Sequence, residues 1–329
     1  MLAFGRDESD AISGQNRRVI TTIKHSALGI AVLFQLALFH PSIAVAKDQI
    51  GVSAPVPLKS FLERKLRHEK FKPAFIQQML RDYETKDFHS VLELNVLLYL
   101  RKSNYHGPQV SDLAVGEVRA FQQAQKKWLE LANSRYGVDQ YSVASLLWIE
   151  SRLGRNVGSF HVPSVYLHLI QAPRVSVQNH LLSRTSKFTD SVTESDQKKI
   201  VQRTHQKAKW ALDELRALQK VHKWNWKIER DLRGSFSGAF GIPQFLPSSY
   251  VRWARSHKKA KQPILSRPED AIMSVAHYLK DHGWKKSNRE AQLAALYKYN
   301  NSHDYAAAIV DLAQRVELES VQDESEPAI

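Results

Sequence analysis

Residues 140–155 read Gln140-Tyr-Ser-Val-Ala-Ser-Leu-Leu-Trp-Ile-Glu150-Ser-Arg-Leu-Gly-Arg155, a pattern that predicts a helix. Stepping back from Glu150 by three, four and seven residues gives Leu147, Leu146 and Val143, so the carboxyl group shares a helix face with an apolar stripe. Burial on that face disfavours the ionised form and raises the pKa of the carboxyl group. A general acid that works near neutral pH requires such a shift.

The same segment permits a second interpretation of the acid. The helix is predicted to end near Gly154, and a glutamate close to a helix end can pair with Arg152 or Arg155 on the next turn. Ion-pair networks also place acids on such faces, so the spacing alone does not decide between the catalytic and the structural interpretation.

The composition favours a mainly α-helical fold. The 329 residues include only 13 Gly and 12 Pro, below the roughly 12% that globular proteins usually carry, so a turn-rich β-sandwich is disfavoured. Helices are expected near 268–282, 288–300 and 304–316, and an exposed helix from about Glu194. Zero cysteines exclude a disulfide scaffold, a thiol nucleophile and a Cys-ligated zinc site.

The charge balance predicts an anionic partner. The chain has 47 Lys and Arg against 33 Asp and Glu, a formal charge of +14, which suits nucleic acid, anionic lipid or an anionic cell wall. Basic pairs such as Lys126-Lys127 and Lys198-Lys199 are scattered, and no nucleic-acid-binding motif is present, so nucleic acid is not expected. A solvated basic surface without a specific partner is the alternative.

The N-terminal segment resembles a leader in its order of features. Arg17, Arg18 and Lys24 precede an apolar run at 27–39, and Ala44-Val45-Ala46 follows. This order predicts a signal peptide over residues 1–46 and an exported, periplasmic protein. The apolar run has 13 residues, fewer than the ~20 that span a bilayer, so an inner-membrane anchor through residues 25–46 is the alternative. Residues 47–58 are predicted to be a linker.

The densest turn signal lies at residues 234–250, which read Gly234-Ser-Phe-Ser-Gly-Ala-Phe-Gly-Ile-Pro-Gln-Phe-Leu-Pro-Ser-Ser-Tyr250. No phosphate-binding motif is present. Ser235 and Gln244 offer a hydroxyl and an amide among Phe rings, a combination suited to sugar hydroxyls and N-acetyl groups. The alternative is a structural turn before a helix that Ser248 or Ser249 caps.

Two further segments bear on ligands. The segment 294–305 ends a helix in Asn300 and Asn301 beside tyrosines, although an Asn at a helix end is usually a cap. The fourteen histidines include no His-Glu-x-x-His pattern, so neither a metal nor a cofactor is expected.

Together these segments resemble the lytic murein transglycosylases, most closely the membrane-bound B type with its lysozyme-like domain. The residues that carry the resemblance form four blocks in family order: Trp148 to Arg155, Gly234 to Tyr250, Asp270 to Trp284, and Tyr297 to Ser302. The similarity extends from about Phe61 to Val316. It implies a lysozyme-like α-helical domain over residues 59–316 with a central substrate cleft. Residues 317–329 contain five acidic residues and no basic one, and this composition predicts a frayed acidic tail.

The resemblance also implies a reaction and a set of site residues. Glu150 is the single catalytic acid and base, and the sugar cleft around it is lined by Ser235, Gln244, Tyr278, Tyr299 and Asn300. The substrate is the glycan strand of peptidoglycan, cleaved between N-acetylmuramic acid and N-acetylglucosamine without water to leave a 1,6-anhydro ring. A hydrolytic muramidase and a non-catalytic wall-binding scaffold are the alternatives, and a basic nucleic-acid binder ranks third.

Three departures from the family pattern qualify the resemblance. Val251 to Pro268 contains no Asp or Glu where some relatives carry a calcium loop, so no bound calcium is predicted. Pro173-Arg174-Val175 keeps at most one of the paired arginines that relatives have. The stretch 175–232 is longer and more basic than expected, and it fits a lid, a partner surface or a plain insertion.

Overall fold

The computed structural model of this protein describes residues 54–101, 110–230, 232–258 and 262–325. Over these ranges the backbone forms thirteen α-helices and two short strands, so the prediction of a mainly α-helical fold is confirmed. The predicted leader, residues 1–46, lies outside the described residues, as does most of the predicted linker. The last linker residues, 54–58, are not helical, and the first helix follows them directly.

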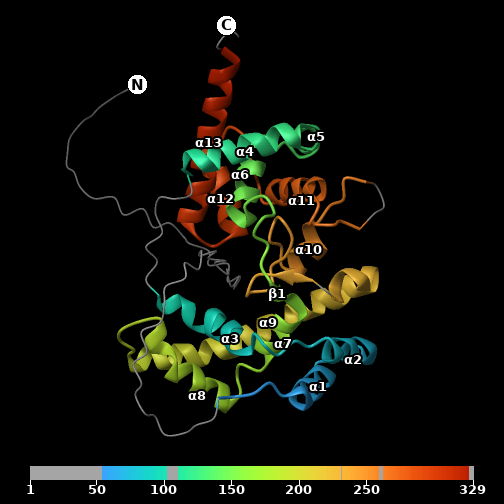
Figure 1. The fold of residues 1–329 in the computed structure, drawn as a ribbon, viewed down its shortest axis with the longest axis vertical. Coiled ribbons are helices and arrows are strands. Elements are labelled where there is room, and N and C mark those ends of the chain that lie inside the picture. Colours follow the sequence, from blue (N-terminus) through green and yellow to red (C-terminus); the bar gives the residue numbers. More distant parts are fainter. Residues whose placement is uncertain (1–53, 102–109, 231, 259–261, 326–329) are drawn as a thin grey trace, which may run out of the picture.

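The helices form two lobes, one above the other in Figure 1. The lower lobe contains α1 (Lys59–His68), α2 (Pro73–Arg81), α3 (Phe88–Leu97), α7 (Val162–Ile170), α8 (Val175–Ser183) and α9 (Glu194–Arg230). The upper lobe contains α4 (Asp112–Ala124), α5 (Lys126–Tyr136), α6 (Gln140–Ser151), α11 (Pro268–Asp281), α12 (Arg289–Tyr299) and α13 (His303–Ser325). Between them, α10 (Pro247–Trp253) packs against both α9 and α11. Single 3₁₀ turns follow α3 and α8, at Leu98–Leu100 and Thr185–Lys187.

The chain passes between the lobes three times, after α3, after α6 and after α9. The second and third passages pair as an antiparallel ribbon of β1 (Phe160–His161) and β2 (Arg233–Gly234). Only glycine fits at Gly234, because a Cβ atom there would lie 2.1 Å from the carbonyl oxygen of Ala239. The ribbon therefore places the glycine-rich segment beside the passage that leaves α6.

Helix α6 carries the predicted acid and lies in the middle of the upper lobe. It packs against α4, α5, α11 and α13. Val143, Leu146 and Leu147 have exposed fractions of 0–1%, which confirms the predicted apolar stripe. The opposite side is also covered, since Trp148 has an exposed fraction of 1%. Glu150 is therefore placed by a helix that is buried on nearly every side.

The end of α6 fixes the glycine-rich segment. The hydroxyl of Ser151 donates a hydrogen bond of 2.7 Å to the carbonyl of Ile242. Helix α6 ends at Ser151, slightly before the predicted Gly154, and Arg152 is left-handed with φ of 52°. This hydrogen bond holds the segment Gly241 to Gln244 against the end of α6. Gln244 therefore lies in the same region as Glu150.

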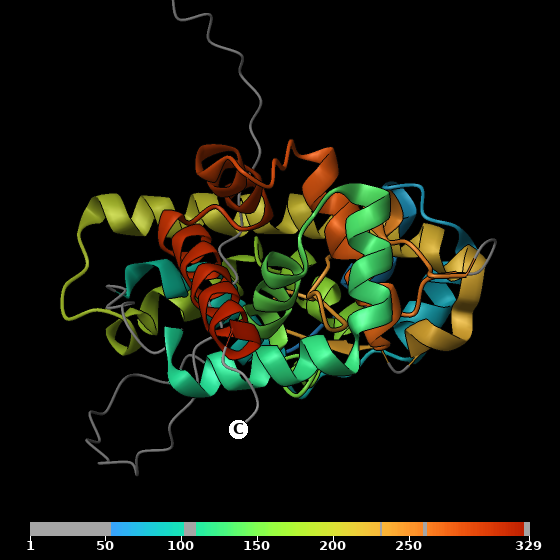
Figure 2. The ribbon, with the colours of Figure 1, turned by 90° about the horizontal axis from the view of Figure 1, so that it is seen from above.

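Helix α9 begins at Glu194, as predicted, and is 37 residues long. Figure 2 shows it as one helix across the width of the molecule. The prediction of an exposed helix is wrong for its inner face, because Ile200, Ala211 and Leu215 are fully buried. That face packs against α3, α7, α8 and α10. The stretch 175–232 therefore contributes a central helix of the lower lobe.

The helices near the C-terminus start within one residue of their predicted positions, and α11 and α12 also end within one residue of them. Helix α12 is capped by Asn288, whose side chain accepts a hydrogen bond from Ala291 N. Helix α13 continues to Ser325, so the expected end at 316 and the expected frayed tail are wrong for residues 317–325. The extension is supported by an ion pair one turn apart, Arg315 to Glu319 at 3.1 Å. Helix α4 is capped by Ser111, whose side chain accepts a hydrogen bond from Ala114 N.

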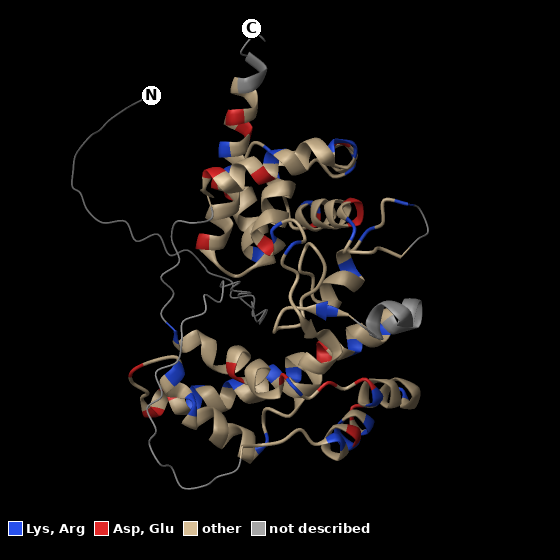
Figure 3. Cartoon of the chain, viewed as in Figure 1, with Lys and Arg blue, Asp and Glu red and all other residues tan. Residues whose placement is uncertain are grey.

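Figure 3 shows Lys and Arg spread over both lobes and not gathered on one element. None of the helices in the described ranges combines the length and the apolar character needed to span a bilayer.

Candidate active site

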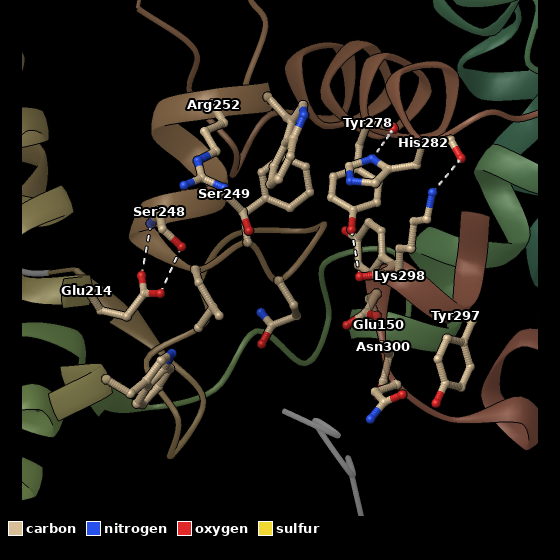
Figure 4. Close-up of a pocket in the computed structure, with 17 residues that line it drawn as sticks. Glu150, Glu214, Ser248, Ser249, Arg252, Tyr278, His282, Tyr297, Lys298 and Asn300 are labelled. Carbon is tan, nitrogen blue, oxygen red and sulfur yellow. Dashed lines mark hydrogen bonds between the residues drawn. The ribbon is translucent and has the colours of Figure 1, made fainter. Parts of the chain in front are cut away.

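A cavity of about 480 Å³ lies where the two lobes meet, and Figure 4 shows the side chains around it. Five of the six predicted site residues line it, namely Glu150, Gln244, Tyr278, Tyr299 and Asn300. They come from the end of α6, the glycine-rich segment, α11 and the end of α12. The fold thus brings together side chains from four segments that lie far apart in the sequence.

Glu150 is one of two buried acids that line this cavity, with an exposed fraction of 5%. The Tyr305 hydroxyl on α13 donates a hydrogen bond to its Oε1 atom. Burial raises the pKa of the Glu150 carboxyl group to about 8, while the bond from Tyr305 acts in the opposite direction. Burial is the larger effect, so at neutral pH this carboxyl group holds a proton that it can donate.

The structure does not favour the ion-pair interpretation of Glu150. The guanidinium group of Arg155 pairs with Glu117 on α4. That of Arg152 lies over the ring of Trp148, 3.7 Å from the ring centre. The hydrogen-bond partner of the Glu150 carboxyl group is instead a neutral hydroxyl, which leaves the acid in a setting that favours its protonated form.

Gln244 has an unusual backbone and an unsatisfied side chain. Its φ of 51° is rare for a residue with a Cβ atom. The Nε2 atom donates to the carbonyls of Gly241 at 2.8 Å and Val157 at 3.1 Å. The Oε1 atom is buried and has no partner among the described residues. Because a buried acceptor without a donor is unfavourable, this oxygen is suited to a ligand N–H or O–H group.

Asn300 presents a second acceptor of the same kind. It follows the last residue of α12, and its backbone N–H closes the helix on Leu296 O at 3.0 Å. Its position is that of the cap which the sequence also allowed. Its Oδ1 atom is buried without a partner among the described residues, so the side chain remains available to the cavity.

Tyr278 and Tyr299 contribute rings to the cavity wall, and their hydroxyl groups are engaged by the protein. Tyr278 donates to the carbonyl of Lys298 at 2.7 Å, and Tyr299 donates to that of Pro243 at 2.5 Å. The two ring centres are 4.7 Å apart, edge to face. These hydrogen bonds hold the rings in place and tie the glycine-rich segment to α12, so the tyrosines offer apolar faces.

Ser235 does not line the cavity. Its hydroxyl oxygen accepts hydrogen bonds from Ala239 N at 3.1 Å and Ser237 N at 3.3 Å. Its backbone N–H also donates to the Ala239 carbonyl at 2.8 Å. The side chain of Ser235 closes the turn at 235–239. For this residue the structure therefore matches the alternative interpretation, a structural turn.

Several residues of the site were not predicted. Tyr305, which contacts Glu150 from behind the cavity wall, lies 155 positions after it in the chain, and no local pattern predicts their contact. Trp210 and Glu214 on α9 line the cavity itself. Because these two residues are four positions apart, they lie on the same helix face. The sequence shows this spacing, but the spacing does not predict which residues the two side chains contact.

Glu214 is a second buried acid in the cavity, with an exposed fraction of 4%. Its two oxygens accept from the backbone N–H of Ser248 at 2.9 Å and from the Ser248 hydroxyl at 2.8 Å. Burial raises the pKa of Glu214, and the two bonds from Ser248 counteract part of that rise. Glu214 thereby anchors the first turn of α10 to α9.

Two departures predicted from the sequence can be located. Arg174 donates to the Val56 carbonyl at 2.8 Å, so it holds the N-terminal segment on the lower lobe and does not line the cavity. Asp270 accepts from His257 N at 2.8 Å and Ile264 N at 2.7 Å, which organises the segment before α11. Within the described ranges, no three His, Asp or Glu side chains are grouped so that they could hold a metal ion.

A family model described as the transglycosylase SLT domain matches residues 56–296. The chain belongs to this family. A curated relative is the membrane-bound lytic murein transglycosylase B of Escherichia coli, 47% identical over 64 residues. That alignment covers 20% of this chain and 18% of the relative's length.

Solved structures of the transglycosylase SLT type share the fold. The soluble lytic transglycosylase SltB1 of Pseudomonas aeruginosa matches with a TM-score of 0.59 at 20% identity, over 80% of this chain and 98% of that one. The Escherichia coli lytic transglycosylase Slt35 in complex with bulgecin A matches with a TM-score of 0.59 at 21% identity, over 80% and 93% of the two chains. These likenesses confirm the predicted lysozyme-like fold.

Proposed function

We propose that this protein is a lytic transglycosylase that cleaves the β-1,4 bond between N-acetylmuramic acid and N-acetylglucosamine in peptidoglycan, with Glu150 as its only acid and base. The observation that carries the proposal is the buried Glu150 carboxyl group, which has a raised pKa and a neutral hydroxyl donor. Membership in the transglycosylase SLT family supports the same reaction class.

The reaction begins with proton transfer from Glu150. The protonated carboxyl group gives its proton to the glycosidic oxygen as the bond between that oxygen and the muramoyl C1 breaks. The positive charge that develops at C1 is eased by the N-acetyl group of the substrate. Because the substrate supplies this group, the second carboxylate that most glycosidases use is not needed.

The second half of the reaction returns a proton to the enzyme. Glu150, now ionised, takes the proton from the muramoyl 6-hydroxyl, and the oxygen of that hydroxyl bonds to C1 to form the 1,6-anhydro ring. The hydrogen bond from Tyr305 favours the ionised carboxylate, so it supports the base that exists between the two steps. Atoms balance without water, and the enzyme ends in its starting protonation state.

The other cavity residues position the glycan. The free acceptor atoms of Gln244 and Asn300 would receive N–H or O–H groups of the sugars. The rings of Tyr278 and Tyr299 would pack against sugar C–H faces. Hydrolysis would require an activated water, and the second acid of the cavity, Glu214, already accepts a hydrogen bond on each oxygen. The arrangement therefore favours ring closure over the muramidase alternative.

The test is product analysis of purified sacculi digested in ¹⁸O-labelled water. We expect mass spectra of 1,6-anhydromuropeptides without ¹⁸O. Products heavier by one labelled water, with a free reducing end, would contradict the mechanism and identify a muramidase. The Glu150→Gln variant should release almost nothing, and Glu214→Gln is the matched control, because it also replaces a buried acid of the same cavity.

The leader and the location of the protein form a separate part of the proposal. We expect an exported protein of the periplasm, with residues 1–46 removed as a signal peptide or kept as an anchor through 25–46. Peptidoglycan is the expected partner, and the formal charge of +14 suits a wall whose peptide stems carry carboxylates. Fractionation of cells, with N-terminal sequencing of the recovered protein, distinguishes cleavage after Ala46 from an intact anchor, and recovery in the cytosol would contradict both.

A further inference from the structure

One end of the cavity is built by α9 and α10 and is not used by the proposed reaction. Trp210 and Glu214 reach it from α9, and Ser249 and Arg252 reach it from α10. Figure 4 shows Arg252 above Glu214 and Ser248, on the opposite side of the cavity from Glu150 and Asn300. This end therefore faces a part of the ligand other than the bond to be cleaved.

Arg252 is an exposed cation at this end. Its guanidinium group lies 5.7 Å from the ring centre of Trp253. None of the ion pairs found among the described residues includes Arg252. Lys298 is the basic residue of the opposite end, and its Nζ atom donates to the His282 carbonyl at 3.4 Å. The two ends of the cavity thus differ, because the α10 end carries a guanidinium group that forms no ion pair within the described part of the chain.

The neighbouring Glu214 is not within ion-pair distance of Arg252, although the positive charge of Arg252 lowers the pKa of Glu214 to a small extent. Its oxygens accept from the N–H and the hydroxyl of Ser248, and this fixes the first turn of the helix that carries Arg252. Burial raises the pKa of Glu214, which weakens the repulsion that an incoming anion would meet. Glu214 therefore orients α10, and Arg252 keeps its donors for a ligand.

The chemistry of this end fits a group that combines a carboxylate with an apolar part. A guanidinium group binds a carboxylate through two parallel hydrogen bonds, and the nearby hydroxyl of Ser249 can add a third donor. Trp210 and Leu246 supply apolar surface beside it. In peptidoglycan the carboxylates are carried by the peptide stems attached to the muramoyl residues.

Resting on the proposed function, we propose that Arg252 binds a carboxylate of the peptide stem and makes the enzyme discriminate between charged and amidated stems. Trp210 and Ser249 complete this stem subsite, and Glu214 is a positioning residue for it. The glycan and the cleaved bond remain with Glu150, Gln244 and Asn300. Stem charge is thus recognised at a place distinct from the reacting atoms.

The test uses the full chain with the Glu150→Gln substitution, so that bound ligand is not consumed. Calorimetry compares two disaccharide–tetrapeptide fragments that differ only in whether the stem carboxylates are free or amidated. We expect the free form to bind about tenfold more tightly, as one charge-assisted contact provides. Adding Arg252→Ala should bring this ratio close to one, and Arg252→Lys should keep part of it.

Two controls separate this inference from general effects of charge. Lys298→Ala removes the cation at the other end of the cavity, and Arg64→Ala removes an exposed cation on α1. Both should keep the tenfold ratio. A ratio that survives Arg252→Ala, or one that Lys298→Ala abolishes, would overturn the stem subsite and leave the proposed function standing. If the Glu150→Gln protein binds neither fragment, the proposed function itself fails and the stem subsite fails with it.

Discussion

Glu150 and Glu214 line one cavity from opposite lobes, and both are buried, yet they accept different numbers of hydrogen bonds. Glu150 receives a single hydrogen bond, from the Tyr305 hydroxyl. Glu214 receives two from Ser248, one of them from a backbone N–H at the start of a helix. Burial raises the pKa of both. The two donors on Glu214 hold α9 and α10 together, whereas the single donor on Glu150 fits the acid and base role that we propose for it.

The largest expected effect comes from replacing the two acids in turn. Glu150→Gln removes the exchangeable proton and should lower the rate of anhydromuropeptide release by about 10³-fold or more. Glu214→Gln keeps an oxygen acceptor for Ser248 and should retain activity within about tenfold. Timed release from sacculi, measured by chromatography, checks both. Equal losses in the two variants would break the comparison.

The pH dependence of stability should follow the same contrast. Because the folded-state pKa of Glu150 is about 8, above its ordinary value of 4.5, the folded chain binds the proton more tightly than the unfolded chain between these values. Stability is therefore lost as the pH rises through this window and then levels off. Wild type should lose up to about 4 kcal/mol relative to Glu150→Gln between pH 5 and pH 9, measured by urea unfolding.

The same urea-unfolding measurement on Glu214→Gln compares the second buried acid with Glu150. Glu214→Gln should change the pH dependence in the same direction but by less, because the Ser248 donors offset part of the effect of burial. A pH profile of Glu150→Gln that is indistinguishable from wild type would contradict the raised pKa.

Some features of this contrast could be predicted from the sequence, and others could not. The apolar stripe of Val143, Leu146 and Leu147 is a local pattern of period 3.6, and it correctly indicated that Glu150 is buried. The start of α9 at Glu194 was likewise local, since acidic residues favour a first helical turn. Local rules thus located the acid and the starts of α6, α9, α11, α12 and α13.

Contacts between distant segments were not accessible in this way. The bond from Tyr305 to Glu150 depends on how α13 packs on α6, and the bonds from Ser248 to Glu214 depend on how α10 packs on α9. No window of sequence encodes either packing. At Ser235 a predicted sugar contact was instead a contact within a turn. A hydroxyl group in a glycine-rich segment can form hydrogen bonds with the turn backbone as readily as with a ligand. The length of α13 beyond 316 was missed because an acidic composition resembles a disordered tail.

Tyr305→Phe tests the single donor on Glu150. The hydrogen bond lowers the pKa of the acid, so its loss should move the alkaline limb of the kcat/KM profile to higher pH. We expect a fall of about tenfold in kcat at neutral pH, because the carboxylate that acts in the second step loses its stabilising donor. A limb that moves to lower pH would show that Tyr305 does not act through Glu150.

The smallest effect is expected for Ser248→Ala, which removes one of the two donors on Glu214. The free energy of unfolding should fall by about 1 kcal/mol, since the backbone N–H bond remains. Thermal unfolding measures this change. The alkaline limb of the kcat/KM profile should stay at its wild-type position, and a shift of that limb would show that the two ends of the cavity are coupled.

The pKa of the Glu150 carboxyl group decides whether this residue can act as the proton donor. Carbon-13 NMR of protein labelled at the glutamate side-chain carboxyl can measure it, with the Glu150→Gln variant identifying the resonance. We expect a titration midpoint near pH 8. A midpoint near the ordinary value of 4.5 would mean that the acid is ionised at neutral pH, and it would contradict the role of Glu150 as proton donor.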